Sequence, residues 1–317
     1  MKGKSTEKTK RLDTLSEEDR VKYLSCCRLH SGETWEDSVS GHRVSVADAG
    51  RSEAVISLMN GTRPDLVVAD PPYNVKLNGK NTPSLGQLDI EKYQSFSKNW
   101  MNSVCTVLEQ NAHVYIWLGC DYKNGFQPLP EFMLLMREFT ELVPRNFITM
   151  RNQRGYGTQK NWMWVRQELL HYVKGEPSFS VAYTEIPKIV KGYYKTVSGK
   201  KTENMERSKS ETIRPGNVWV DIQQVFYRMQ ENVPGCFAQK PLKAIQRIIV
   251  TSSQPGGVVF DPFCHSGTTL IAGEMLGRTV YTMDIDPIFA ELAIRRLENF
   301  RKTGRTGWQW HEPFGEI

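Results

Sequence analysis

The chain has 317 residues, 39% of them hydrophobic, and a formal net charge of +6 at pH 7. This length suits one large α/β domain with an insertion, or two domains of ordinary size. No run of eighteen apolar residues occurs and the first ten residues are polar, so we expect a cytoplasmic protein without membrane contact. The basic excess suits a nucleic-acid partner but does not by itself establish one.

Cysteine and histidine are dispersed along the sequence, with six residues of each type. No C-x-x-C pair occurs, nor any cysteine and histidine spacing typical of zinc ligands. We therefore expect no metal site and no disulfide framework, and we interpret the thiols as reduced and mostly structural.

Residues 1–30 predict a mobile polar tail with a helical stretch near Glu17 to Leu24, followed by one domain at 31–317. Strands are expected at 43–49, 64–70, 112–119, 146–152, 257–261 and 279–286. Helices are expected at 53–60, 91–110, 129–139, 241–252, 268–276 and 287–301. Because strands alternate with helices, the sheet should be mainly parallel.

This alternation breaks in the middle of the chain. Between Lys188 and Arg214 there are eight Lys or Arg against three Glu, with almost no pattern of buried positions. We interpret residues 178–235 as an inserted region, partly flexible and basic.

A glycine-containing turn in VVFDPFCHSGTTLIAGEMLGRTVYTMDID, at 258–286, predicts a nucleotide-type cofactor site. Ser266 and Gly267 are small enough to let a ligand approach the backbone, and the two threonines that follow can cap a helix. Asp284 lies 23 residues after Asp261. That spacing is close to the one at which a carboxylate binds a ribose in doubly wound folds.

The same turn disfavours a dinucleotide. It lacks G-x-G-x-x-G, and Asp261 would repel a pyrophosphate at the end of the strand. S-adenosylmethionine, which carries a sulfonium and an ammonium group, fits better. An ordinary capped strand-to-helix turn is the alternative.

The stretch VVADPPYNVK, at 67–76, places an acid, two prolines and an aromatic residue where a buried strand should end. Taken alone, these residues also suit a turn in which the aspartate caps and the prolines rigidify the backbone.

Together, DPPY at 70–73, AQKPL at 238–242 and DPFCHSGTT at 261–269 resemble the motifs of the β-class amino-methylating DNA methyltransferases, which use S-adenosylmethionine. The order of the motifs matches that class. The resemblance implies an α/β fold with a Rossmann-like, doubly wound, mainly parallel sheet, of the circularly permuted class I methyltransferase type. It implies a methyltransferase domain at 31–317, with 178–235 as its inserted target-recognition region.

The resemblance also assigns the cofactor-binding positions. It implies that Asp48 contacts the adenine of the cofactor, that Asp284 contacts the ribose, and that Lys240 lies beside the cofactor. The remaining implied positions are Asp261, Pro262, Phe263, His265, Ser266, Gly267, Thr268 and Thr269.

The catalytic residues implied are Asp70, Pro71, Pro72 and Tyr73. An exocyclic amino group is a poor nucleophile because its lone pair is delocalised into the base. Asp70 and the carbonyl of Pro71 can accept its two hydrogens, which directs the lone pair toward the methyl group. The prolines stiffen the loop, and Tyr73 would stack on a target base flipped out of the duplex.

Two positions depart from the family pattern. His265 stands where the family usually has glycine, and a side chain there is costly if the backbone needs a positive φ. Cys236 and Phe237 replace the usual His-Pro pair before AQKP. Neither change removes a catalytic group, so we expect a divergent but active enzyme whose cofactor affinity is in question.

Candidate DNA contacts combine positive charge with aromatic rings. In the insertion they are Lys191, Tyr193, Tyr194, Lys195 and Arg207, and after the strand at 146–152 they are Arg151, Arg154 and Tyr156. Each could instead belong to a solvated loop. Trp162 and Trp164 are interpreted as core residues.

We predict an adenine-N6 DNA methyltransferase, because aspartate at the first position of the tetrad is the commoner adenine form in the family. Cytosine-N4 methylation by the same acceptors is the alternative, and RNA or protein methylation is a smaller one. A nicotinamide-dependent oxidoreductase and a DNA-binding module without catalysis are alternatives from other classes. A homodimer and a paired restriction endonuclease are left open as partners.

Overall fold

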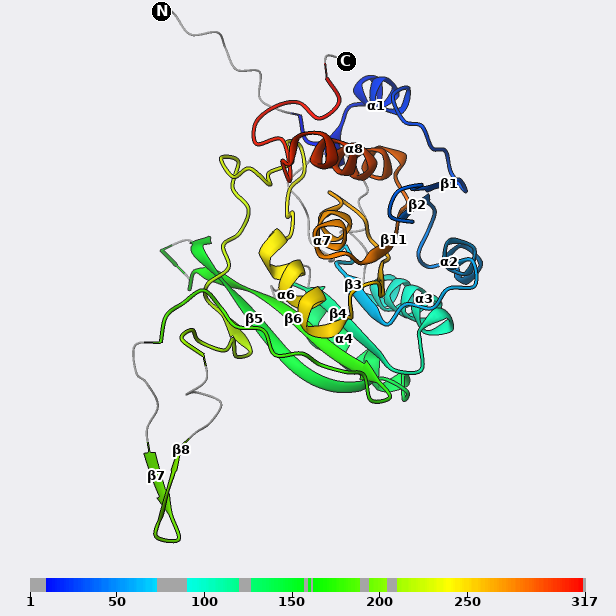
Figure 1. Ribbon diagram of the computed structural model, residues 1–317. Helices are drawn as coiled ribbons and strands as arrows, with labels where there is room; N and C mark the ends of the chain where they lie inside the picture. Colours follow the sequence, from blue (N-terminus) through cyan, green and yellow to red (C-terminus); the bar gives the residue numbers. More distant parts are fainter. Residues whose placement is uncertain are drawn as a thin grey trace, which may run out of the picture.

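A nine-stranded mixed sheet forms the centre of the protein, shown as a computed structural model in Figure 1. The structure describes residues 10–72, 90–119, 127–156, 159–160, 162–188, 194–203 and 210–315. Across the sheet the strands are β1 (Thr34–Glu36), β2 (Arg43–Val46), β11 (Thr279–Asp284), β10 (Val258–Asp261), β3 (Leu66–Ala69), β4 (Ala112–Leu118), β6 (Trp164–Lys174), β5 (Val143–Tyr156) and β9 (Val218–Trp219). The five strands from β2 to β4 are parallel, whereas β1 and β6 are antiparallel to their neighbours. The predicted mainly parallel α/β fold is confirmed.

Helices cover both faces of this sheet (Figure 1). One face carries α2 (Ser52–Met59), α3 (Ile90–Val107) and α4 (Pro128–Leu135), with the short η3 (Met136–Glu138), and the other carries α6 (Leu242–Ser252), α7 (Thr268–Leu276) and α8 (Pro287–Thr303). In β3, Val67 and Ala69 pack in the core on the side of α2, α3 and α4, and Leu66 and Val68 pack in the core on the side of α6, α7 and α8. A parallel strand buried on both faces needs apolar residues at every position, which explains the uninterrupted apolar runs of the sequence.

The sequence patterns did not predict β6, which lies between β4 and β5. Its residues Leu169 and Leu170 enter opposite cores, but the adjacent Glu168 is fully buried as well. Glu168 accepts a hydrogen bond from the Thr149 hydroxyl at 2.7 Å. Charged and apolar residues therefore mix along the strand, and neither an alternation nor an apolar run results.

The chain from residue 10 to residue 30 packs against the domain, which differs from the expected mobile tail. The helix α1 (Glu17–Leu24) forms where a helical stretch was expected, and η1 (Leu12–Thr14) precedes it. Leu12, which is 2% exposed, and Tyr23 join a cluster with Ile288 of α8 and Phe314. Residues 1–9 lie outside the described residues.

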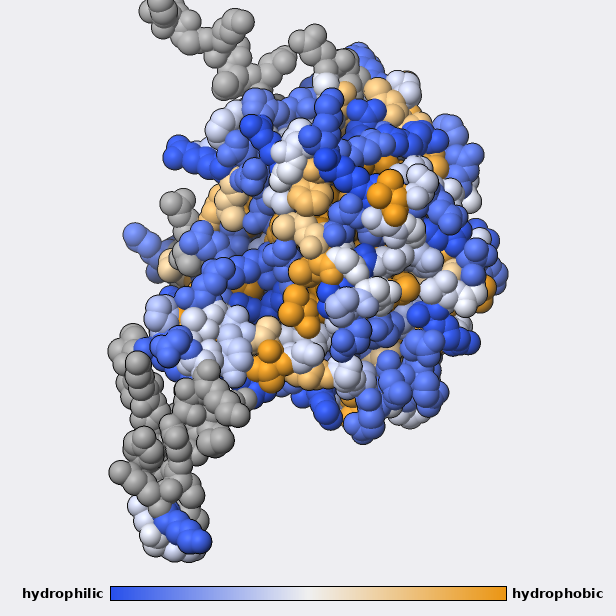
Figure 2. All heavy atoms as spheres, viewed as in Figure 1, coloured by the Kyte–Doolittle hydropathy of each residue, from blue (hydrophilic) through white to orange (hydrophobic). Residues whose placement is uncertain are grey.

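The interpreted insertion contains a two-stranded hairpin of β7 (Tyr194–Val197) and β8 (Lys200–Glu203), which stands apart from the main sheet (Figure 1 and Figure 2). Backbone hydrogen bonds join the chain before this hairpin to the chain after it. The N–H of Thr184 donates to the carbonyl oxygen of Ile213 at 2.9 Å, and the N–H of Ile213 donates to that of Ile186 at 2.9 Å. Further along the chain, strand β9 pairs with β5 of the main sheet. The boundaries at 178–235 stay a prediction.

Within the described ranges, no helix is both long and apolar enough to cross a membrane. Nor does this part of the chain group three His, Cys, Asp or Glu side chains so that they could hold a metal ion.

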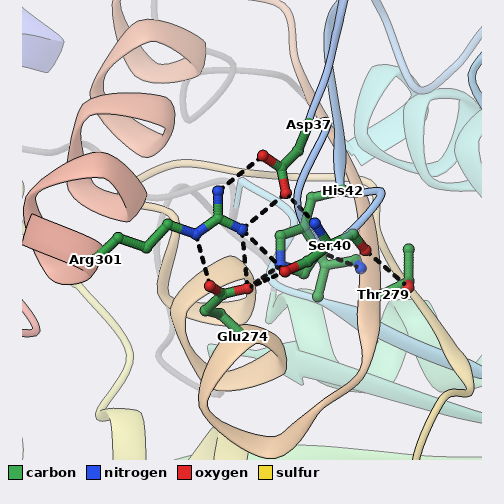
Figure 3. A network of polar contacts seen from close by, with 7 residues as sticks. Asp37, Ser40, His42, Glu274, Thr279 and Arg301 are labelled. Carbon is green, nitrogen blue, oxygen red and sulfur yellow. Dashed lines mark hydrogen bonds and ion pairs between the residues drawn. The ribbon is translucent and has the colours of Figure 1, made fainter.

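A polar network joins the connection between β1 and β2 to α7 and α8 (Figure 3). Arg301 of α8 donates to both carboxylate oxygens of Asp37 at 2.7 Å, and to Oε1 of Glu274 in α7 at 2.6 Å. The other oxygen of Glu274 lies 2.9 Å from Nε2 of His42 and accepts from Ser40 at 2.8 Å. Hydrogen bonds from the Arg301 guanidinium lower the pKa of both Asp37 and Glu274 to about 2.

Replacing Arg301 by methionine should lower the free energy of unfolding by about 3 kcal/mol at pH 7, because two mostly buried carboxylates lose their partner. The exposed neighbouring variant Lys302→Met should change it by less than about 0.5 kcal/mol. Urea unfolding monitored by circular dichroism measures both.

The same experiment has a pH dependence. Both carboxyls have a lower pKa in the folded protein, so their contribution is fully present above about pH 5 and is lost as the pH falls toward about 2. The gap between wild type and Arg301→Met should narrow over that interval. Equal losses in the two variants, or a gap that persists at pH 2, would contradict the role given to Arg301.

Candidate active site

Four aspartates lie at one edge of the sheet, where adjacent parallel strands end. They are Asp48 after β2, Asp284 in β11, Asp261 in β10 and Asp70 after β3. The chain passes from β10 through α7 to β11 on one side, and from β3 through α3 to β4 on the other. Ligands of open α/β sheets bind in the crevice at such a switch point. Asp261 and Asp70 flank that crevice.

An ion pair holds the carboxylate of Asp70. Nζ of Lys240, a side chain only 6% exposed, lies 2.6 Å from Oδ2 of Asp70. The same ammonium lies 5.5 Å from the centre of the Trp117 ring and 3.5 Å from the carbonyl oxygen of Ala238. These contacts fix the position of the carboxylate at the mouth of the crevice.

The rest of the predicted catalytic tetrad follows Asp70 directly. Pro71 is buried and Pro72 is half-buried. Tyr73 lies outside the described residues.

Two carboxyl groups with raised pKa values border the turn between β10 and α7, one at the end of β10 and one at the end of β11. Asp261 is 5% exposed and accepts the backbone N–H of Phe263 at 2.9 Å, and burial raises its pKa to about 7. Asp284 accepts the N–H groups of His265 at 2.9 Å and Asp286 at 3.0 Å, and burial raises its pKa to about 6. A cationic ligand beside these groups would favour their ionised forms.

Two residues of this turn adopt a left-handed backbone. Gly267 has a φ of 69°, and a Cβ there would lie 2.8 Å from the Cβ of Ala293 in α8, so only glycine fits. His265 has a φ of 44°, a conformation that costs energy for any residue with a Cβ. His265 therefore has the positive φ at which a side chain in place of glycine is costly.

The imidazole of His265 lies beside the aromatic ring of Phe289. Its ring centre lies 5.0 Å from that of Phe289 in α8. Burial lowers the pKa of His265 to about 4, so the ring is neutral at pH 7.

Arg296 of α8 is hydrogen-bonded to the turn between β10 and α7, and the sequence did not predict this role. It is 0% exposed, and Nη1 donates to the carbonyl oxygen of Ser266 at 2.7 Å and to Oγ1 of Thr268 at 3.0 Å. Its Nε donates to the carbonyl oxygen of Thr306 at 2.7 Å. The available signal was an arginine at the helical spacing of the apolar residues of α8.

A small cavity brings many of the predicted residues together. Its lining includes Asp70, Lys240, Asp261, Phe263, His265, Ser266, Thr268 and Thr269. Pro262 and Gly267 belong to the same turn but not to the lining. Asp48 lies on the same edge of the sheet, outside the cavity, where it is exposed and accepts the N–H of Gly50 at 2.8 Å.

A much larger cavity, of about 790 Å³, lies between α6 and the strands β4, β5 and β6. Two of its polar side chains are engaged with protein partners: His171 Nε2 lies 2.9 Å from Nδ1 of His113, and the Tyr115 hydroxyl lies 2.8 Å from that of Ser252. Burial lowers the pKa of His171 to about 3. We assign the chemistry to the smaller crevice because it holds the acids at the switch point, whereas size alone favours the larger one.

The predicted DNA contacts are described only in part. Arg151 is an exposed residue of β5. Arg154 and Tyr156 belong to β5, and Tyr194 and Lys195 belong to β7, with only their backbones described. Lys191, Tyr193 and Arg207 lie outside the described residues.

The interpretation of Trp162 as a core residue is wrong. Its side chain is 90% exposed, because it lies in the turn that joins β5 to β6 rather than within a strand. Trp164 begins β6.

Known proteins resemble the chain over most of its length. A family model described as DNA methylase, of the N6 and N4 methyltransferase type, matches residues 64–295. The type II methyltransferase M.HpaI of Haemophilus parainfluenzae is 28% identical over 235 residues, covering 74% of this chain and 68% of that protein. The DNA adenine methyltransferase YhdJ of Escherichia coli strain K12 is 28% identical over 240 residues, covering 74% and 76%.

Solved structures share the fold. The cytosine-N4-specific PvuII DNA methyltransferase is similar with a TM-score of 0.56 at 13% identity, covering 79% of this chain and 84% of that one. The complex of M1.HpyAVI with S-adenosylmethionine has a TM-score of 0.52 at 17% identity, covering 80% and 98%. At these identities the likeness shows the fold alone.

Proposed function

Because the chain belongs to the DNA methylase family of N6 and N4 methyltransferases, we propose that it transfers a methyl group from S-adenosylmethionine to the N6 amino group of an adenine in DNA. The observation that carries this proposal is the position of Asp70, held by Lys240 at the switch point beside the β10–α7 turn. The name of the relative YhdJ, a DNA adenine methyltransferase, supports the choice of base.

Two observations support the cofactor. The aspartates at the ends of β2 and β11 stand on neighbouring strands, where carboxylates can accept hydrogen bonds from the adenine and ribose of a nucleoside. Asp261, whose pKa is raised by burial, suits a cationic ligand better than an anionic one. When bound, S-adenosylmethionine supplies a methyl group carried by a sulfonium.

The chain's own residues act on the amino group of the target base. Asp70 and the carbonyl of Pro71 accept its two hydrogens, which favours a pyramidal nitrogen whose lone pair is no longer delocalised into the ring and faces the methyl carbon. The nitrogen gains the methyl group and releases one proton, with S-adenosylhomocysteine as the second product. Asp70 is placed to accept that proton, and Lys240 keeps its carboxylate oriented. The base must leave the duplex to reach these groups.

Replacing Asp70 by asparagine should reduce methyl transfer about 100-fold or more, because the amide cannot accept the amino hydrogens as the carboxylate does. The measurement is transfer of a labelled methyl group to unmethylated plasmid DNA, followed by digestion to nucleosides and mass spectrometry. We expect N6-methyldeoxyadenosine from the wild type. N4-methyldeoxycytidine would identify the alternative reaction, and full activity of Asp70→Asn would rule out this site.

The variant His265→Gly should bind S-adenosylmethionine about fivefold more tightly, since glycine adopts the left-handed backbone without strain and clears the turn for the ligand. Calorimetric titration measures the affinity. The matched variant His265→Ala removes the ring but keeps a Cβ, which separates the two effects. Unchanged or weaker binding by His265→Gly would contradict this prediction.

Lys240→Met should lower the single-turnover rate at saturating cofactor about tenfold, because the Asp70 carboxylate loses its orienting partner, and change cofactor affinity less than threefold. Lys240→Arg should recover part of the rate. The control is Lys243→Met, one turn along on α6, where the side chain is 42% exposed. A large loss of cofactor affinity with an unchanged single-turnover rate would show that Lys240 serves the cofactor instead.

A further inference from the structure

Strands β5 and β6 form a long antiparallel hairpin (Figure 1), and its position relative to Asp70 follows from the strand registers. Ala69 pairs with Ile116, so Asp70 is level with Trp117, which pairs with Leu169 of β6. Strand β6 begins at Trp164, five residues before Leu169. At about 3.3 Å per residue, its start lies about 16 Å beyond Asp70 along the strands and two strand spacings, or about 10 Å, to the side.

The turn at the end of this hairpin exposes two large apolar side chains. Trp162 is 90% exposed and Met163 is 62% exposed. Two consecutive large apolar residues with mostly exposed side chains are typical of a surface that contacts another molecule. The hydrophobic core offers no explanation for them.

Positive charge surrounds these two residues. Lys160 is exposed in the same turn, and Arg151 is exposed opposite Arg166 across the β5–β6 ladder. The Arg166 side chain is 58% exposed, although its Nε lies 3.0 Å from the buried carboxylate of Glu168. Cations beside an exposed aromatic ring fit a nucleic acid, whose phosphates bind the charges and whose bases stack on the ring. The offsets from Asp70 are comparable to the width of a DNA groove, about 12 Å.

We propose that Trp162 and Met163 form a wedge that enters the DNA stack and fills the space left by the target base when it turns toward Asp70. This inference rests on the proposed function and deepens it. Extruding a base breaks its stacking and pairing, and an apolar side chain inserted between base steps replaces part of the lost contact. Lys160, Arg166 and Arg151 contact the flanking phosphates and keep the wedge in register.

The test uses the full chain and a short duplex that contains the methylation site mapped from wild-type products on unmethylated phage λ DNA. A fluorescent analogue replaces the target base, 2-aminopurine for adenine or pyrrolocytosine for cytosine, in the presence of S-adenosylhomocysteine. The fluorescence rise on binding should fall about fivefold or more in Trp162→Ala and be mostly kept in Trp162→Phe. Trp310→Ala, at another tryptophan that is 60% exposed, is the matched control and should behave as wild type.

Methyl transfer gives a second readout. Trp162→Ala should lower kcat/KM on the duplex about tenfold while changing it less than twofold on the isolated target strand, where no stack has to be filled. Cofactor affinity should be unchanged. Normal fluorescence and normal kcat/KM in Trp162→Ala would overturn the wedge, and so would equal losses on duplex and single strand.

Two further outcomes are distinguishable. If Trp162→Ala turns a dimer into a monomer by light scattering while base extrusion is unchanged, the surface is a protein interface and the wedge is refuted. If the wild type transfers no methyl group to any DNA, the proposed function itself fails, and the wedge fails with it.

Discussion

Parallel pairing of β10 with β3 is the constraint on which the candidate site depends. The two strands come from opposite ends of the chain, and their register places Val259 beside Leu66. Because they are parallel, the residues that follow them emerge at the same edge, which brings Asp261 and Asp70 to one crevice. Lys240, 170 positions after Asp70, then joins the two halves through a 2.6 Å ion pair. The site exists only when both halves of the chain share one sheet.

The parallel core was predictable because strands that are buried on both faces appear in the sequence as uninterrupted apolar runs. The candidate site was predicted from three motifs taken together, because each turn alone also has a structural explanation, and the structure brings Asp70, Lys240 and Asp261 to one crevice. Strand β6 was not predictable, since the buried Glu168 depends on two partners that the sequence pattern does not show, the Thr149 hydroxyl at 2.7 Å and the Arg166 guanidinium at 3.0 Å. Arg296 was missed because most of its acceptors are backbone carbonyls distant in the sequence, and Trp162 was misassigned because aromatic character does not encode exposure.

The two edges of the sheet use buried carboxyl groups in opposite ways. At the edge where β2 and β11 begin, Arg301 lowers the pKa of Asp37 to about 2, and the network joins helices and strands. At the edge where these strands end, burial raises the pKa of Asp284 to about 6, and that of Asp261 to about 7. Paired acids stabilise a fold, whereas acids kept at a raised pKa in a crevice are typical of a functional site.

The central claim is that the cofactor binds at the β10–β3 switch point rather than in the larger cavity beneath α6. Hydrogen exchange measured by mass spectrometry, with and without S-adenosylmethionine, tests it directly. We predict slower exchange in peptides that cover 261–269 and 283–286, and no change in peptides from 213–219, which line the larger cavity. Slower exchange confined to 213–219, with the β10–α7 turn unaffected, would contradict the account.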